Sequence, residues 1–407
     1  MICLKQEEKK EACMKSITRR TFFSGMTAGI AGMLFGSHPK IPSEKLINNQ
    51  DELKIKQYNP LGKTGIKTSD IIFGAGAIHN PGVIRYAFDL GINIFDTASN
   101  YGRGVSEEII GQGLKGVRDR AHIITKQYFQ PRRRITKESI TRLLEASFKN
   151  LQTDYVDGLF IHTMKTMHLM RNEEIVSSFS QFKKEGKVRF TGFSTHNEKT
   201  ILAECVKPEY SGLVDAVMFM YNHIEGKMIE PLIAKMRQKG IGTIAMKTLA
   251  GGKQGNLKKF VSERSSYPQA AISWVLANEH IDCAALTMDN YSLIEDYVAA
   301  SGKKLDRTDL ALLQKYRDAV STSYCRVSCT SCESDCPHNV AISDIMRYVM
   351  YYEDYGHQKR AIDQYSELDD AHKPLLCQSC RGYCSQACPY GLRVKEQLLR
   401  AYTLLTV

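Results

Sequence analysis

Four side chains with complementary proton chemistry stand at the ends of short apolar stretches of this sequence. They are the acid Asp96, the phenol Tyr101, the amine Lys126 and the imidazole His162. A buried phenol has a pKa of about 10 or above, which is too high for easy proton donation. A neighbouring ammonium lowers that pKa, a carboxylate keeps the ammonium charged, and an imidazole can orient a carbonyl oxygen. The set predicts proton delivery beside a hydride acceptor.

These side chains need a scaffold that brings them together, and the pattern of the sequence supplies one between about residues 53 and 305. Helical periods such as 136–151, 173–185 and 267–278 separate eight short apolar stretches that are rich in β-branched residues. This alternation predicts an α/β fold, a (β/α)₈ TIM barrel, whose chemistry lies at the carboxyl ends of the strands. The expected strands are Ile71–Phe73, Asn93–Phe95, His122–Thr125, Val156–Ile161, Val188–Phe193, Ala216–Met220, Gly242–Ala245 and Cys283–Leu286.

Each of the four side chains also has a structural explanation when it is taken alone. Asp96 could cap a loop, Tyr101 could cover it, Lys126 could pair with a surface carboxylate, and His162 could be a hydrogen-bonded core histidine. Their occurrence at successive strand ends favours a shared site over four independent structural roles.

Four segments of this region resemble the aldo-keto reductases: Gly91–Gly102, Ile124–Lys126, Asp154–His162 and Gly186–Ser194. The resemblance extends over about 240 residues. It implies a catalytic tetrad of the four side chains above, with Tyr101 as the general acid. It also implies NADPH or NADH as cofactor and a small carbonyl or alcohol as substrate.

The expected cofactor contacts depart from the family pattern. Thr195 follows Ser194 where the family usually has Asn, Met218 stands where Gln is expected, and Met246 replaces an aromatic residue. The segment 287–295 has no arginine for a 2′-phosphate. Lys247 could contact the cofactor in a different arrangement. The predicted cofactor-binding residues are therefore Ser194, Thr195, Met218, Met246 and Lys247. NADH as the cofactor, weak cofactor binding and a new binding arrangement remain open.

Eight of the twelve cysteines lie near the C-terminus, and their spacing is that of metal ligands. Each group of four ends in Cys-x₃-Cys-Pro, which resembles the two-cluster ferredoxins, where the fourth cysteine binds the other cluster. We therefore expect a small, mainly helical ferredoxin-like domain over residues 320–407, with a helical spacer at 342–355. The predicted ligands are Cys325, Cys329, Cys332 and Cys336 in the first group and Cys377, Cys380, Cys384 and Cys388 in the second.

Two [4Fe–4S] clusters are the preferred occupants of these cysteines, and a single cluster is the fallback. Each group has one three-residue gap where ferredoxins usually have two residues, which leaves the pairing of ligands open. Zinc is the main alternative because Cys-x₂-Cys pairs bind it well. Disulfides are a weaker alternative, because they normally stabilise short secreted chains.

The first 38 residues resemble a twin-arginine export signal. Arg19 and Arg20 precede Phe22, and a weakly apolar run follows at residues 25–35. That run is too short for a membrane span, although an uncleaved signal could anchor the chain. We expect a periplasmic or membrane-associated protein, with a cytoplasmic one as the alternative. Translation could begin at Met1 or at Met14.

The net charge of +11 is an unusual feature of the composition. The predicted signal carries +3 of it, from six Lys or Arg and three Glu. Two clusters with their thiolates would subtract about 4 more. The remaining charge of about +4 demands no nucleic-acid partner.

The parts together predict a carbonyl reductase or alcohol dehydrogenase with an appended cluster domain for electron transfer or structure. A hydride carries two electrons and a cluster accepts one, so a flavin would normally mediate between them. The sequence has no Gly-x-Gly-x-x-Gly fingerprint for a flavin dinucleotide. One alternative is a redox-partner protein with a non-catalytic barrel. Another is a barrel isomerase or dehydratase that acts on sugars. We expect a redox partner protein both for the reductase with clusters and for the electron-transfer protein with a non-catalytic barrel.

Overall fold

The computed structural model describes residues 53–406, apart from residues 130–133, 252–256, 258, 321–324, 327–328 and 355. The predicted export signal at residues 1–38 lies outside the described residues.

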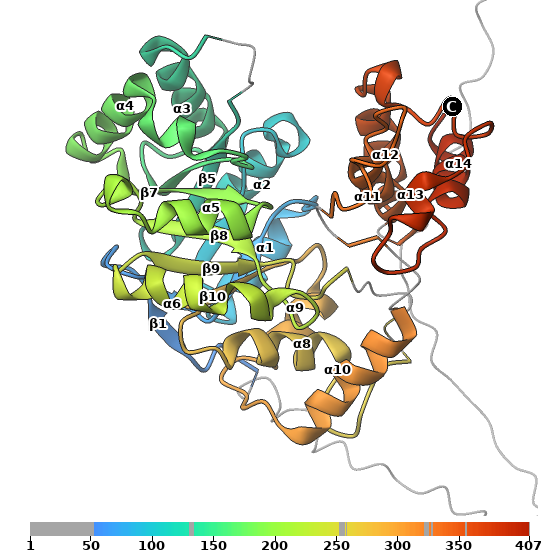
Figure 1. Ribbon diagram of the computed structural model, residues 1–407. Coiled ribbons are helices and arrows are strands. Elements are labelled where there is room, and N and C mark those ends of the chain that lie inside the picture. The colour runs from blue at the N-terminus through green and yellow to red at the C-terminus, as the bar shows by residue number, and fades with distance from the viewer. Residues whose placement is uncertain are drawn as a thin grey trace, which may run out of the picture. The chain divides into compact units, whose positions relative to one another are not determined.

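Eight parallel strands close into a barrel, in the order β10-β3-β4-β5-β6-β7-β8-β9. They are β3 (Ile71–Gly74), β4 (Ile94–Asp96), β5 (His122–Gln127), β6 (Val156–Ile161), β7 (Val188–Thr195), β8 (Ala216–Met220), β9 (Gly242–Met246) and β10 (Cys283–Thr287). Each expected strand is present, so the TIM barrel is confirmed (Figure 1).

Helices follow the strands and cover the outside of the barrel (Figure 1). They are α1 (Pro81–Asp89), α2 (Val105–Gly113), α3 (Lys137–Leu151), α4 (Glu173–Lys184), α5 (Glu198–Cys205), α6 (Glu230–Gln238), α8 (Tyr267–Leu276) and α9 (Tyr291–Val298). Side chains fix where several of them begin. Thr136 and Ser139 form a reciprocal capping box on α3, and the Asn172 and Ser266 side chains accept backbone N–H bonds at the starts of α4 and α8.

The barrel interior is filled by side chains that point inward from alternate strand positions. Leu61 closes one end of this layer from the turn between β1 (Tyr58–Pro60) and β2 (Lys67–Ser69), an antiparallel hairpin that the sequence analysis does not predict. Since three-residue strands carry little periodic signal, only contacts with the barrel define this hairpin. The other members of the layer are Ile66, Ile72, Ile94, Ile124, Phe160, Phe190, Ala216, Met218, Ile244 and Cys283.

Gly192 on β7 occupies a position of this interior where no larger residue fits. An added Cβ would overlap the Ala216 carbonyl oxygen and lie 2.9 Å from Phe160 Cε1. We expect Gly192→Ala to lower the free energy of unfolding by about 3 kcal/mol, because a strand carbonyl cannot move aside as a flexible side chain can. Urea unfolding measures the effect. Gly76→Ala is the control, since its Cβ would meet nothing nearer than Tyr101 Cε2 at 3.9 Å. Equal stabilities of the two variants would contradict this account of the packing.

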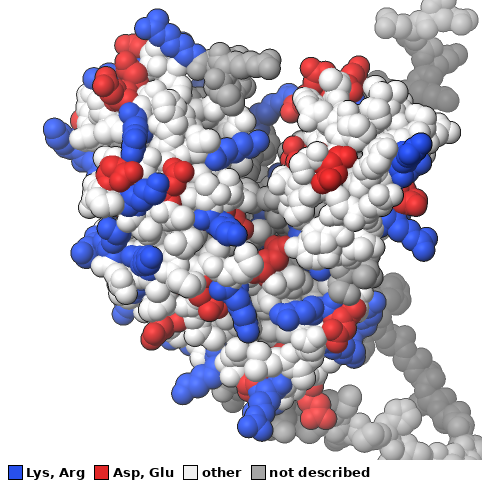
Figure 2. Space-filling model, viewed as in Figure 1, with Lys and Arg blue, Asp and Glu red and all other residues white. Residues whose placement is uncertain are grey.

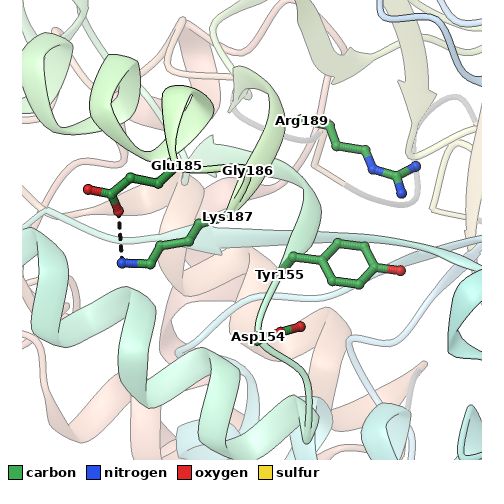
Figure 3. A pocket seen from close by; sticks show the side chains of 6 residues that line it. All are labelled: Asp154, Tyr155, Glu185, Gly186, Lys187 and Arg189. Carbon is green, nitrogen blue, oxygen red and sulfur yellow. Dashed lines mark ion pairs between the residues drawn. The ribbon is translucent and has the colours of Figure 1, made fainter.

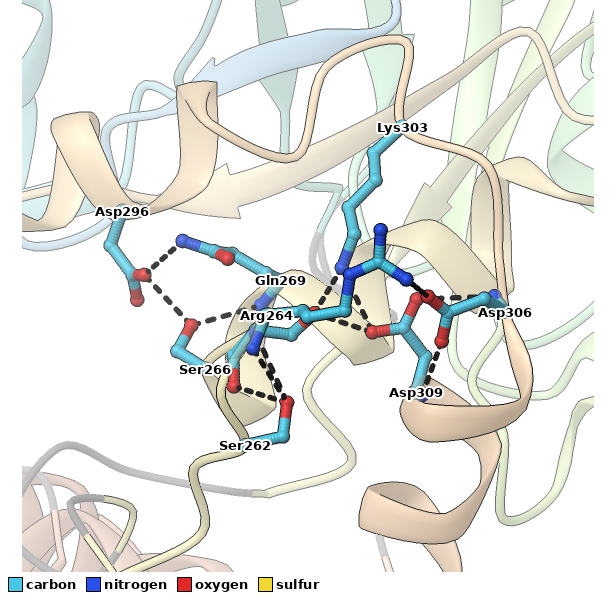
Figure 4. A network of polar contacts seen from close by, with 9 residues as sticks. Ser262, Arg264, Ser266, Gln269, Asp296, Lys303, Asp306 and Asp309 are labelled. Atoms are coloured by element: carbon cyan, nitrogen blue, oxygen red, sulfur yellow. Dashed lines mark hydrogen bonds and ion pairs between the residues drawn. The ribbon is translucent and has the colours of Figure 1, made fainter.

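A further helix, α10 (Arg307–Val320), packs against α8, so the packing of the barrel continues beyond residue 305. A buried polar network joins the two (Figure 4). Asp309 is fully buried and binds the Lys303 ammonium at 2.8 Å and the Ser265 hydroxyl at 2.5 Å. Because each partner satisfies the buried carboxylate, the network holds α10 in place without an unpaired charge.

Described residues between Cys325 and Leu405 form a second hydrophobic core of their own. Its helices are α11 (Ile342–Glu353), α12 (Gln358–Ser366), the short α13 (Tyr383–Gln386) and α14 (Val394–Leu405). The expected helical spacer at 342–355 is α11, which buries Ile342, Ile345, Met346 and Met350 at helical spacing. The region is helical, and cysteines contribute to its core.

Lys and Arg side chains are interspersed with Asp and Glu over the face shown in Figure 2. On that face the net positive charge is therefore not gathered into one continuous basic surface. Among the described residues, no helix is both long enough and apolar enough to cross a membrane.

Candidate active site

The four predicted catalytic side chains meet at the carboxyl ends of β4, β5 and β6. Asp96 ends β4 and Lys126 lies near the end of β5, and the ammonium of Lys126 is 2.6 Å from Asp96 Oδ1. The same ammonium donates to the Thr97 carbonyl at 2.7 Å and lies 5.3 Å from the centre of the Tyr101 ring. The His162 ring stands edge-on to that of Tyr101, with 5.4 Å between centres.

The ion pair at the base of this group is buried. Lys126 is 1% exposed and Asp96 is 4% exposed. Burial by itself would lower the pKa of the Lys126 ammonium, but the Asp96 carboxylate and the hydrogen bond with Tyr101 raise that pKa above its ordinary value. Lys126 therefore stays charged across the physiological range and stands beside the phenol as a fixed cation.

Two opposing effects act on the pKa of the Tyr101 phenol. Burial raises its pKa, and the Lys126 ammonium opposes that rise. The net pKa remains above the ordinary value, so the ammonium acts in the expected direction but burial outweighs it. Tyr101 is consequently protonated at neutral pH, as a general acid must be.

His162 is held neutral. Burial, followed by the nearby Lys126 ammonium, lowers the pKa of His162 to about 3. Its Nδ1 lies 3.0 Å from Asn100 Oδ1, a contact that orients the ring. Asn100 is a functional neighbour that the sequence analysis missed, although it directly precedes Tyr101 in the segment that resembles the family.

These pKa values predict a flat pH profile for carbonyl reduction between about pH 5 and pH 9. His162 is neutral above its pKa of about 3, and Tyr101 keeps its proton up to a pKa above the ordinary 10.0. The rate should fall only at alkaline pH, as the phenol loses its proton. Initial rates across this range test the expectation. A change in rate around pH 6.5 that disappears in the His162→Gln variant would show instead that an imidazolium takes part.

A second polar chain supports β5 from behind. Thr125 donates to Glu107 Oε1 at 2.6 Å, and Asn150 donates to the other Glu107 oxygen at 3.0 Å. Glu107 and Thr125 are fully buried. Because Thr125 directly precedes Lys126, this chain ties the strand end to α2 and α3 and limits movement of the ammonium.

The predicted cofactor residues fall into two groups. Ser194 lies at the end of β7, and its hydroxyl accepts the Thr163 N–H at 2.9 Å. The Thr195 hydroxyl donates to the Met164 carbonyl at 2.8 Å and accepts the Asn197 N–H at 3.0 Å. Both hydroxyls therefore connect β7 to neighbouring loops.

The other three cofactor residues lie on β8 and at the end of β9. Met218 is buried in the barrel interior, and Met246 packs partly buried against the same layer. Lys247 directly follows β9 and has a left-handed backbone, with φ of 58°. Left-handed backbone at a residue other than glycine is uncommon and gathers at functional sites. Lys247 also lies near His196, whose pKa is lowered well below 6.5, first by burial and then by Lys247.

A separate hollow of about 430 Å³ lies at the opposite, amino-terminal ends of β6 and β7 (Figure 3). Arg118 and Arg189 lie over the ring of Tyr155, at 4.0 Å and 5.3 Å from its centre. Both arginines also bind the buried Asp157. That end of a TIM barrel serves stability, so these contacts are structural. The hollow is lined by Asp154, Tyr155, Glu185, Gly186, Lys187 and Arg189.

The eight C-terminal cysteines are free thiols, and three of them are buried in the helical core. Burial, and then the thiols of Cys329, Cys332 and Cys388, raise the pKa of Cys325 to about 12. Within the described residues, no three or more His, Cys, Asp or Glu side chains are arranged so as to hold a metal ion. The cysteines are therefore near one another but do not form a closed metal site in this structure.

A closed parallel barrel with polar side chains gathered at the carboxyl ends of its strands is the architecture of the α/β-barrel enzymes. The sequence model of the aldo/keto reductase family matches residues 79–264. Residues 79–264 of this chain are therefore similar in sequence to the aldo/keto reductase family.

Curated relatives are similar to the same region of the chain, and a solved structure shares its fold. The chain is 29% identical to L-galactose dehydrogenase of Arabidopsis thaliana over 286 residues, 60% of this chain and 88% of that protein. It is 30% identical to the aldo-keto reductase YhdN of Bacillus subtilis over 48% of this chain and 63% of that protein. The holo form of an aldo-keto reductase from Bacillus halodurans matches the fold with a TM-score of 0.54, at 21% identity, over 64% of this chain and 95% of that one.

Proposed function

We propose that this protein reduces a small carbonyl compound, or oxidises the corresponding alcohol, with NADPH or NADH. One observation carries the proposal: a buried ammonium lies 2.6 Å from a carboxylate and hydrogen-bonds to a protonated phenol beside a neutral imidazole, at the catalytic end of a barrel. Two of the curated relatives bear the names of a dehydrogenase and of an aldo-keto reductase, which supports the same chemistry.

Each side chain has a distinct task in this proposal. Tyr101 donates its proton to the carbonyl oxygen in the direction of reduction. Lys126 stabilises the phenolate that remains, and Asp96 keeps Lys126 charged and in place. His162 orients the carbonyl oxygen, and Asn100 fixes the His162 ring. A nicotinamide, when bound, supplies or accepts the hydride at the carbonyl carbon.

The residues present fit a nicotinamide at the reacting end of the site. The proton donor and its cation are preorganised, and the left-handed Lys247 places a cation at the end of β9, where it would assist in holding the cofactor. The segment 287–295 still has no arginine for a 2′-phosphate, so both nucleotides are candidates. Titration of the purified protein with NADPH and NADH separately, followed by fluorescence, tests the proposal. Binding of neither would contradict it.

We also propose two [4Fe–4S] clusters in the helical region, with one cluster as the fallback. The donors fit in kind, because all eight are free cysteine thiols, which is the ligand set of such clusters. They also fit in grouping, because six of them lie in or against one small core. Cluster ligation would hold them as thiolates. Appended clusters could serve electron transfer or structure.

The neighbours of Cys325 and Cys377 suggest which cysteines share a cluster, whereas Cys332 neighbours Cys384 of the other proposed set as well as Cys388 and Cys329 of its own. Cys325 has Cys329, Cys332 and Cys388 as its electrostatic neighbours. Cys377 has Cys336, Cys384 and Cys380. We propose that the fourth cysteine of each sequence group joins the other three-cysteine group, as in the two-cluster ferredoxins. The two proposed ligand sets are Cys325, Cys329, Cys332 and Cys388, and Cys336, Cys377, Cys380 and Cys384.

Export by the twin-arginine route remains our proposal for localisation. It is supported by Arg19, Arg20 and the apolar run that follows them. The route also suits a protein whose clusters are inserted before transport. Cell fractionation that found the mature chain only in the cytoplasm would contradict it.

A further inference from the structure

We propose that the surface around Leu375, Leu376, Tyr383 and Arg381 is a docking site for an acidic one-electron carrier protein. This inference rests on the clusters of the proposed function, because it assigns the place where an electron enters or leaves the second cysteine group.

The apolar part of this surface is unusual for its exposure. Leu375 is 50% exposed, Leu376 is 55% exposed and Tyr383 is 41% exposed. The two leucines directly precede Cys377, whose side chain is buried, and Tyr383 directly precedes the buried Cys384. Leu375 and Leu376 adjoin each other in the chain, and adjoining exposed apolar side chains mark interaction sites more often than isolated ones do. Here they lie next to two of the proposed ligands of one cluster.

Local hydrogen bonds hold these residues on one compact stretch of chain. The Cys377 N–H donates to the Pro374 carbonyl, and the Cys380 N–H donates to the Cys377 carbonyl. Lys395, at the start of α14, donates to the Cys380 carbonyl at 2.7 Å and to the Gln378 carbonyl at 3.3 Å. The leucines, the cysteine turn and the start of α14 are therefore neighbours on the surface.

The charged part of this surface is positive. From residue 373 to residue 395 the chain has four basic residues and no acidic one. Lys373 is paired with Asp370 at 2.8 Å, which offsets its charge, and Glu396 directly follows Lys395. Arg381 and Arg393 are exposed, and Lys395 is half-buried. An apolar centre with a positive rim fits a partner with an acidic rim, whereas a second copy of this chain would bring like charges together.

Electron transfer gives a reason for apolar side chains to be exposed at this place. A reduced carrier docked here would lose one electron, and an oxidised cluster held by Cys377 and Cys380 would gain it. The transfer requires the two redox centres to approach closely, and Cys377 and Cys380 lie just beneath this surface. A membrane with anionic lipids also has negative charge, but it offers no electron to the cysteine group, which is why the structure favours the protein partner.

The test uses the full-length holoprotein, prepared anaerobically, with reduced flavodoxin as the acidic one-electron carrier. Binding is measured by calorimetry at low and high salt, and cluster reduction is followed by bleaching in stopped flow. Leu375→Ser with Leu376→Ser, and Arg381→Glu separately, should each weaken binding and slow bleaching by about tenfold or more. Leu310→Ser and Arg307→Glu, which make a single Leu→Ser change and an Arg→Glu change at exposed positions of α10, are the controls.

A small reductant separates this inference from the proposed function. Methyl viologen radical should bleach the clusters of all variants equally, because it needs no docking surface. If methyl viologen bleaches nothing in the wild-type protein, the clusters of the proposed function fail, and binding of flavodoxin still decides the surface. Equal flavodoxin affinity in the docking variants and the controls would overturn the inference. So would loss of binding to phosphatidylglycerol vesicles in the docking variants without any change toward flavodoxin.

Discussion

Tyr101→Phe is expected to lower the rate of carbonyl reduction by about 10³-fold, with little change in nucleotide affinity. The substitution removes one hydroxyl, which is the proton donor beside the Lys126 ammonium in the proposed mechanism. The ring of Tyr101 still fills its place beside His162, so the barrel should keep its stability. Single-turnover rates with saturating nucleotide measure the chemical step without contributions from product release.

Tyr128→Phe is the matched control for this prediction. Tyr128 lies two residues beyond Lys126, is 43% exposed, and should lose its hydroxyl without any effect on the rate. If Tyr101→Phe reduced carbonyl compounds at the wild-type rate, the proposed reductase mechanism would be wrong. If the clusters of that variant were still reduced normally by a carrier protein, the result would favour the alternative in which the barrel does not catalyse. Turnover without any redox change would instead favour an isomerase or dehydratase.

Cys332→Ser is expected to remove about half of the bound iron and sulfide, which is about four iron atoms of about eight. The loss follows because one ligand set loses a thiolate while the other stays intact. The proposed pairing predicts how double variants behave. Cys332→Ser with Cys388→Ser should lose no more iron than the single variant, because both cysteines belong to one set. Cys332→Ser with Cys384→Ser should lose nearly all of it.

Iron and sulfide analysis of anaerobically purified protein checks these expectations, and Cys205→Ser is the control. Cys205 is buried on α5 in the barrel core, apart from the helical core to which the C-terminal cysteines belong, so it should hold no metal. Equal iron loss in the two double variants would contradict the proposed pairing. Zinc in place of iron and sulfide would contradict the clusters altogether.

The barrel could be predicted from the sequence because its strands are apolar runs of ordinary length separated by periodic helices. Val156–Ile161 and Ala216–Met220 agree with the structure at both ends. Other strands extend by one or two residues beyond the expected end, and in β5, which reaches Gln127, and β7, which reaches Thr195, the added residues are polar. The β1–β2 hairpin and α10 escaped prediction, since their places depend on contacts with distant strands and with α8.

The residue types of the site could be predicted from the sequence, but the effects that set their pKa values and orientations could not. Strand ends identified Asp96, Tyr101, Lys126 and His162, because residues at the ends of parallel barrel strands must converge. The sequence could not show that burial outweighs the Lys126 ammonium at Tyr101, or that Asn100 orients His162. It also could not show that the Ser194 and Thr195 hydroxyls bind loop backbone, or that Lys247 has a left-handed backbone.

Transfer of deuterium from a labelled nucleotide tests the central proposal most directly. The wild-type protein would be incubated with NADPH or NADH deuterated at the transferable position and a panel of small aldehydes and ketones. We predict alcohol product that carries one deuterium on the former carbonyl carbon, with the yield lost in Tyr101→Phe and retained in Tyr128→Phe. Alcohol without that label, or no bound nucleotide and no alcohol from any member of the panel, would contradict the proposed reductase.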